Sequence, residues 1–221
     1  MTKIKICGLF RPCDIDFVNE AKPDWCGFIL NFPKSHRNVT PEQVRALRER
    51  LDPAVTPVGV FVDEPLETAA ALLNDGTISV AQLHGHEDAD YIAALRWLAP
   101  NHPIWKAFKI RSAGDLAAAL ASPADLVLLD SGQGTGQTFD WSLAAGVERP
   151  FLLAGGLTPD NIPQAIETVR PYGLDLSSGV ETDKVKDREK ILAAVAAARK
   201  EGSICPKDDS ASTAGSTSPR R

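Results

Sequence analysis

The stretch KIKICG, residues 3–8, alternates charged and apolar side chains and ends in a glycine. This period of two predicts a β-strand that carries Lys5 and Cys7 on the face opposite its two isoleucines. A second apolar run, LVLLD at residues 126–130, ends on Asp130. Both runs open into loops that contain glycine. A thiol and a carboxyl group therefore stand where predicted strands end.

Strand-like runs recur along the chain and alternate with helix-like segments. Eight runs begin near Lys3, Trp25, Thr56, Ile78, Pro103, Asp125, Pro150 and Gly173. Segments with the composition and apolar spacing of amphipathic helices lie between most of them, at residues 45–51, 66–75, 91–99, 115–121 and 190–200. Eight alternations predict an α/β fold, a closed (β/α)₈ TIM barrel in one domain over residues 1–201.

Local signals refine this prediction. Thr40 before Pro41 predicts a helix start, with Gln43 completing a capping box, and the pair Thr158–Pro159 predicts another. The segment after the run near Asp125 has the weakest helical pattern. The rival fold is an open doubly wound sheet, which binds nucleotides through an early G-x-G-x-x-G turn. The chain has no glycines at that spacing after its first strand, which favours the barrel.

Composition limits the classes of function. The chain of 221 residues is 43% hydrophobic, enough for a large core, and its net charge of -5 without a basic stripe argues against nucleic acid as a partner. No run approaches the roughly 18 apolar residues of a membrane span, and the first residues do not resemble a secretory signal. Four cysteines without a C-x-x-C pair favour a reducing, cytoplasmic location. Residues 202–221 are polar and rich in serine and threonine, which predicts a disordered tail.

Catalytic groups in such barrels come from the carboxyl ends of the strands. Cys7 and Asp130 occupy such ends, so we interpret them as a base and an acid acting on one substrate. The alternatives are a small buried hydrophobe for Cys7 and a turn cap for Asp130. Arg37 lies in a predicted loop with no obvious acidic partner nearby in sequence and is suited to clamping a substrate carboxylate, unless it is a solvated loop residue.

Strand parity adds further candidates at the predicted mouth of the barrel. It places Gln82 with His84, and Asp175 with Ser177, on inward faces, and we take the first three as substrate-binding residues. The loops LAGGL and LSSGVE close the seventh and eighth strands, where such barrels often hold a phosphate. Their candidate phosphate-binding residues are Gly155, Gly156, Ser178 and Gly179, which would otherwise be ordinary turn residues.

Two other chemistries have candidate residues in the sequence. His84 and His86 with Cys7 or Cys13 would be a zinc site, but their spacing matches no familiar zinc motif, so no metal site is predicted. Lys106 in the apolar run IWKAF suits a Schiff-base lysine, and its structural alternative is a core lysine paired with an acid.

Seven segments, in order, carry a family resemblance: KICGL, SHR, VGVFV, QLHG, LLDSGQGTGQTFDW, LAGGLTPDNI and GLDLSSGVET. Over about residues 3–200 the chain resembles phosphoribosylanthranilate isomerase, the (β/α)₈ isomerase of tryptophan biosynthesis. The resemblance implies an Amadori rearrangement of N-(5-phosphoribosyl)anthranilate without metal or organic cofactor. It implies that Cys7 is the base, that Asp130 is the acid, and that Arg37 contacts the anthranilate carboxylate. It also assigns the phosphate to the four loop residues named above.

This chemistry requires Cys7 to ionise near neutrality, which Lys5 on the same strand face would favour, and Asp130 to start protonated. The chain departs from the family in two places: ETDKVKD lacks the usual Pro-Gly pair, and His36 stands where proline is frequent. Three alternatives stay open, namely a histidine-pathway isomerase, which would need an aspartate in place of Cys7, a Schiff-base aldolase, and a phosphometabolite-binding barrel without turnover. We expect a monomer or a homodimer that binds a small phosphosugar.

Overall fold

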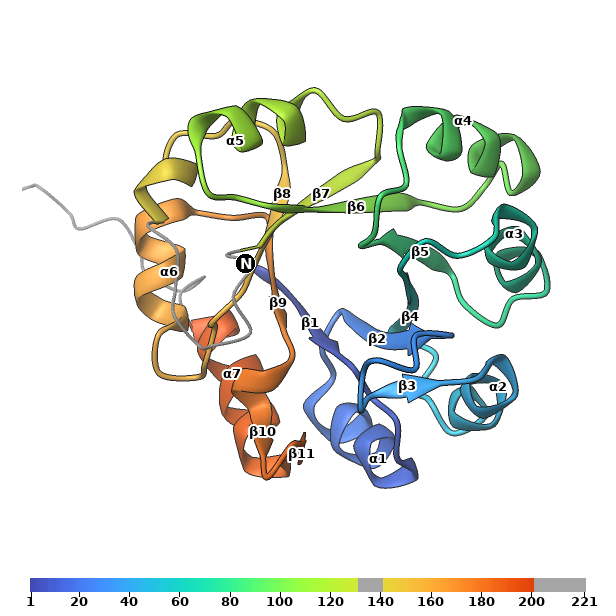
Figure 1. Cartoon of the computed structure of the whole chain (residues 1–221). Helices are drawn as coiled ribbons and strands as arrows, with labels where there is room; N and C mark the ends of the chain where they lie inside the picture. Colours follow the sequence, from blue (N-terminus) through green and yellow to red (C-terminus); the bar gives the residue numbers. More distant parts are fainter. Residues whose placement is uncertain (131–140, 201–221) are drawn as a thin grey trace, which may run out of the picture.

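A ring of parallel strands forms the centre of the computed structural model, which describes residues 1–130 and 141–200 (Figure 1). Each strand pairs in parallel with its neighbours, and β1 pairs with both β2 and β9, so the sheet closes on itself. The barrel strands are β1 (Lys3–Cys7), β2 (Trp25–Leu30), β4 (Thr56–Phe61), β5 (Val80–Leu83), β6 (Ile104–Lys109), β7 (Leu126–Asp130), β8 (Phe151–Ala154) and β9 (Gly173–Leu176). The predicted closed barrel is confirmed, with each strand starting within two residues of its predicted position.

Helices surround this ring (Figure 1). They are α1 (Pro12–Ala21), α2 (Pro41–Arg48), α3 (Leu66–Asn74), α4 (Ala89–Leu98), α5 (Ala113–Leu120), α6 (Ile162–Val169) and α7 (Arg188–Lys200), with the 3₁₀ helices η1 (Trp141–Ala144) and η2 (Ser178–Val180). The short β3 (Asn38–Val39) extends the sheet beside β2, and β10 (Glu181–Thr182) pairs with β11 (Val185–Lys186) in an antiparallel hairpin. No helix within the described ranges is long and apolar enough to cross a bilayer.

Because alternate residues of each strand face opposite sides of the sheet, the apolar side chains form two separate cores. Ile4 and Ile6 belong to the larger core, which also takes in the inner faces of the helices. A smaller core fills the barrel interior with Val58, Val80, Trp105, Ala107, Leu126, Leu128 and Leu152. The predicted alternation of β1 is confirmed, because the isoleucines face the helices while Lys5 and Cys7 face inward.

The helix starts were predicted with mixed success. Thr40 caps α2 as expected: its hydroxyl accepts from the Gln43 amide, and the Gln43 side chain accepts from the Thr40 amide. The predicted start at Thr158–Pro159 is wrong, since α6 begins only at Ile162. The reason is Asn161, whose side chain accepts from the Thr158 amide and donates to the Gly156 carbonyl, holding a turn in front of the helix.

Two predictions fall partly or wholly outside the described residues. The weak helix predicted after the strand near Asp125 falls before the strand near Pro150; residues 131–140 of this connection are not described, and its described part contains the one-turn η1. The described barrel ends with α7 at Lys200. The boundary at residue 201 and the disordered tail over residues 202–221 therefore stay predictions.

Candidate active site

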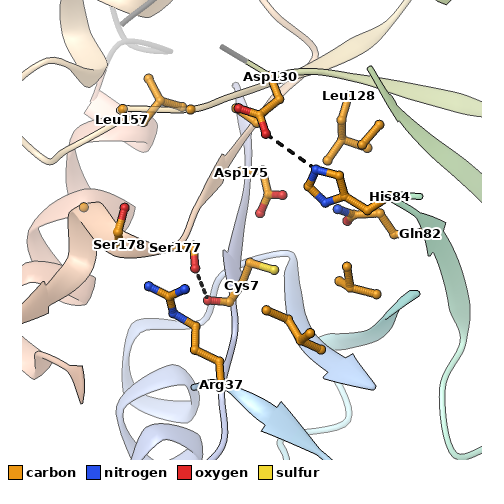
Figure 2. A pocket seen from close by; sticks show the side chains of 17 residues that line it. Cys7, Arg37, Gln82, His84, Leu128, Asp130, Leu157, Asp175, Ser177 and Ser178 are labelled. Carbon is orange, nitrogen blue, oxygen red and sulfur yellow. Dashed lines mark hydrogen bonds and ion pairs between the residues drawn. The ribbon is translucent and has the colours of Figure 1, made fainter. Parts of the chain in front are cut away.

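All ten predicted site residues line one cavity of about 300 Å³ at the carboxyl ends of the strands (Figure 2). Cys7 is the last residue of β1 and Asp130 the last residue of β7, so the strand ends place both at its rim. The predicted residues gathered here are Cys7, Arg37, Gln82, His84, Asp130, Gly155, Gly156, Asp175, Ser178 and Gly179. Ser177 lines the same cavity, as its parity with Asp175 predicts.

Cys7 is 7% exposed and lines the cavity. Burial raises its pKa, because the thiolate loses hydration, and the positive charge of Lys5 opposes that effect. The two effects together raise the pKa of Cys7 above its ordinary value. The expectation of a thiol that ionises near neutrality is therefore wrong, because burial raises the pKa of Cys7 more than the charge of Lys5 lowers it.

Asp130 and His84 lie together on the other side of the cavity (Figure 2). His84 Nε2 is 3.5 Å from Asp130 Oδ2, and the backbone amide of His84 donates to the Phe61 carbonyl, which anchors the residue after β5. The sequence predicted His84 as a substrate contact but not as a neighbour of the acid. Cys7 and Asp130 thus face the same space from opposite sides, as acid and base catalysis on one substrate requires.

Arg37 has an acidic partner that sequence proximity does not reveal. Its Nε and Nη2 donate to the two carboxylate oxygens of Glu181, each at 2.6 Å. The hydrogen bonds to Glu181 raise the pKa of Arg37, and this partner lies 144 positions away in the sequence. The buried Lys186 donates to Glu181 at 2.6 Å and to the Ser177 carbonyl at 2.9 Å. A substrate carboxylate would therefore meet an arginine whose orientation is already set.

The two candidate phosphate loops meet at one wall of the cavity. Gly155 and Gly156, directly after β8, have φ of 88° and 67°, values that favour glycine. Gly179 lies in η2 after β9, and a methyl group on it would stand 1.8 Å from the Leu157 carbonyl oxygen. Because side chains are absent at these positions, backbone groups of both loops reach the cavity, as anion binding requires.

Gln82 and Asp175 are the polar groups deeper in the cavity. Gln82 is 1% exposed, and its side-chain oxygen has no hydrogen-bond partner among the described residues. A buried acceptor without a partner costs about 1–3 kcal/mol, which a donor from a ligand would recover. Asp175 accepts from Lys5 Nζ through both oxygens, at 2.9 and 3.1 Å. Asp175 therefore lines the cavity and also pairs with a lysine buried inside the barrel.

The described residues do not support the other two candidate chemistries. In the part of the chain that the structure describes, no three His, Cys, Asp or Glu residues gather as metal ligands would, and the exposed His86 contacts Asp63. Lys106 donates to Glu87 at 3.0 Å and to the Gly85 carbonyl at 2.8 Å, and it does not line the cavity. It is the core lysine paired with an acid, so the aldolase hypothesis loses its nucleophile.

Comparison with known proteins decides the family. The model of the N-(5'-phosphoribosyl)anthranilate isomerase family matches residues 4–197. The chain belongs to this family. The isomerase of Acetivibrio thermocellus is 42% identical over 204 residues, covering 86% of this chain and 93% of the relative. The isomerase of Lactiplantibacillus plantarum is also 42% identical, over 93% of this chain and 96% of the relative.

Solved isomerase structures of the family agree with the fold. The Thermotoga maritima isomerase superimposes with a TM-score of 0.78 at 35% identity, covering 90% of this chain and all of the other. A phosphoribosylanthranilate isomerase in complex with reduced 1-(o-carboxyphenylamino)-1-deoxyribulose 5-phosphate matches with the same TM-score, identity and coverage. The resemblance predicted from the ordered motifs is confirmed at the level of the family.

Membership of the isomerase family makes the departure at ETDKVKD interpretable. Asp183 and Lys184 stand in place of the usual Pro-Gly pair, and both have positive φ, 53° and 64°. Positive φ at both central residues is the pattern of a type I′ turn, which joins β10 to β11 through two residues. The hairpin places Lys186 beside Glu181. Neither Glu181 nor Lys186 was predicted as a site residue, although two opposite charges five positions apart across a tight turn are a signal for such a pair.

Proposed function

We propose that the chain converts N-(5'-phosphoribosyl)anthranilate into 1-(2-carboxyphenylamino)-1-deoxyribulose 5-phosphate in tryptophan biosynthesis, with Cys7 as base and Asp130 as acid. The observation that carries the proposal is the position of these two groups on opposite sides of one cavity, beside a wall of glycine-rich backbone. Family membership supplies the reaction class, and the complex of a solved relative names the matching product analogue.

Binding orients the substrate at both of its charged ends. The phosphate lies on the loops of Gly155, Gly156, Ser178 and Gly179, where backbone amides and the Ser178 hydroxyl donate to its oxygens. The anthranilate carboxylate lies against Arg37, whose Nη1 is not used in the pair with Glu181. Gln82 and Asp175 face the sugar between them, and the unpaired Gln82 oxygen accepts from a ribose hydroxyl.

Two proton transfers then complete the rearrangement. Asp130 donates its proton to the ribose ring oxygen, the C1–O bond breaks, and the nitrogen lone pair forms the iminium. The positive nitrogen acidifies the C2 proton, which the Cys7 thiolate removes to give the enolamine. Reprotonation at C1 as the 2-hydroxyl loses its proton gives the aminoketone, so atoms and electrons balance within one molecule. The protein supplies position and two proton transfers.

The test separates chemistry from binding. Cys7→Ala and Asp130→Ala are each expected to remove nearly all turnover, measured as the loss of anthranilate fluorescence from the substrate. Titration with inorganic phosphate should give the same affinity as for the unaltered protein, because neither residue belongs to the phosphate loops. A variant that keeps near-normal kcat rejects the role assigned to its residue. Absence of turnover in the unaltered chain would favour the phosphometabolite-binding barrel instead.

Location and assembly follow from other observations. The free thiols of Cys7, Cys13 and Cys26 support a reducing cytoplasm, which we propose as the location. A solved structure of a Thermotoga maritima relative contains monomers generated from a dimeric isomerase. For this chain a monomer or homodimer stays a prediction, and light scattering after size-exclusion chromatography measures it.

A further inference from the structure

Lys5 is a fully buried cation on the inner face of β1, two residues before Cys7. Its Nζ donates to both carboxylate oxygens of Asp175 on the adjacent β9, at 2.9 and 3.1 Å. Burying such a pair removes both charges from water, and apolar side chains of similar volume often replace a buried ion pair without loss of stability. The position of the pair therefore points to a use beyond stability.

Gly27 brings the ammonium group of Lys5 close to the sulfur of Cys7. Gly27 pairs with Cys7 in the register of β1 and β2. A methyl group added to Gly27 would lie 2.8 Å from Cys7 Sγ and 2.9 Å from Lys5 Nζ. Both atoms therefore occupy the space that a side chain would fill, within about 6 Å of each other. At that separation an opposite charge favours the ionised form of a titrating group.

We propose that Lys5 is a positioning residue of the isomerisation: held by Asp175 against Gly27, its ammonium group faces the Cys7 sulfur and stabilises the thiolate. The proposal rests on the role of Cys7 as base. Burial raises the pKa of the thiol, and the positive charge of Lys5 beside the sulfur opposes that effect. Lys5 lies deeper in the barrel than the substrate cavity, so it acts on Cys7 and leaves the sugar to other groups.

Other ionisable groups also act on Cys7 from the surrounding elements. They are Cys26 on β2, Arg37 in the following loop, Asp175 on β9 and Lys186 on β11. The ionisable side chains of His84 and Asp130 line the same cavity on its other side. Arg37 and Lys186 both share the carboxylate of Glu181, which reduces their effect on the sulfur. The charge of Lys5 is the largest influence that favours the thiolate, and that of Asp175 is the largest ionic influence against it.

The experiment measures the thiolate directly, without substrate. The rate at which iodoacetamide alkylates Cys7 is followed from about pH 6 to pH 10 by peptide mass spectrometry, which separates Cys7 from the other cysteines. Lys5→Met should raise the apparent pKa by about one unit or more and slow alkylation about tenfold at neutral pH. Asp175→Asn should move the pKa the opposite way. Lys3→Met, on the same strand but paired with Asp24, should leave it unchanged.

Opposite shifts distinguish a positioning role from a merely structural one. An unchanged alkylation profile in Lys5→Met, or shifts of the same sign in both single variants, would overturn the proposal. If Lys5→Met does not fold because Asp175 is left unpaired, the double variant Lys5→Met/Asp175→Asn replaces it. Its pKa should still exceed that of the unaltered protein, and a value at or below that of the unaltered protein also overturns the proposal.

The same variants separate this inference from the proposed function. The low-pH limb of kcat/KM should move with the alkylation pKa if Cys7 is the base. Turnover retained in Cys7→Ala would reject the base assignment while leaving the coupling between Lys5 and Cys7 intact. Turnover lost in Cys7→Ala, together with a flat alkylation result in Lys5→Met, would reject only the inference about Lys5.

Discussion

Gly179→Ala tests whether the contact between the two loops holds the phosphate. The added methyl group would lie 1.8 Å from the Leu157 carbonyl oxygen and 2.8 Å from its carbonyl carbon. Both neighbours are backbone atoms, so no side chain can rotate away. Restoring a separation of 3.0 Å requires the loops after β8 and β9 to move apart by about 1.2 Å.

That displacement sets the expected magnitude. Overpacking of this kind costs about 1–3 kcal/mol, and each 1.4 kcal/mol corresponds to about a tenfold change in an equilibrium constant. If this free energy destabilises the complex with substrate relative to the free protein, KM for the phosphorylated substrate rises by about 5- to 150-fold. A displacement of about 1 Å at a positioning site has effects of this size. Affinity for inorganic phosphate should fall in parallel, and kcat should fall less than kcat/KM.

The assay follows anthranilate fluorescence over a range of substrate concentrations, with thermal unfolding as the check on folding. Gly114→Ala is the matched control, because its methyl group would lie 3.5 Å from the Ser112 hydroxyl and collide with nothing. Gly114 lies in α5, where alanine stabilises a helix by about 1 kcal/mol relative to glycine. Unchanged KM and phosphate affinity in a folded Gly179→Ala protein would refute the reasoning.

Three further predictions use other parts of the structure. Lys184→Gly should stabilise the protein by about 0.5–1 kcal/mol in urea unfolding by relieving its positive φ; no gain contradicts the turn assignment. Burial raises the pKa of Cys26 to about 12 from 9.0, so the unfolded chain loses this proton first and stability falls above pH 9. Between pH 7 and 10 the Cys26→Ala variant should lose about 1.4 kcal/mol less unfolding free energy than the unaltered protein. An equal loss of unfolding free energy in the two proteins refutes this prediction. Arg37→Ala should raise KM about 10- to 100-fold with kcat largely kept; unchanged KM rejects the carboxylate contact.

Much of the fold could be predicted because its signals are local. The period of two in KIKIC and the helical spacing of KILAAVAAARK depend only on neighbouring residues. The same alternation identified which side chains face the barrel interior. The start of α6 was predicted wrongly because the Asn161 side chain, bonded to the Thr158 amide and the Gly156 carbonyl, holds a turn where the Thr-Pro signal predicts a helix.

Sequence by itself determined the residue types at the strand ends, and with them the candidate acid, base and phosphate loops. Tertiary structure alone decided their partners. Arg37 meets Glu181 across 144 positions of the chain, and Lys5 meets Asp175 across 170. Such pairs depend on barrel closure and strand register, which join residues that no local pattern relates. The direction of the Cys7 pKa was likewise decided by burial, a property of the folded molecule that no single strand possesses.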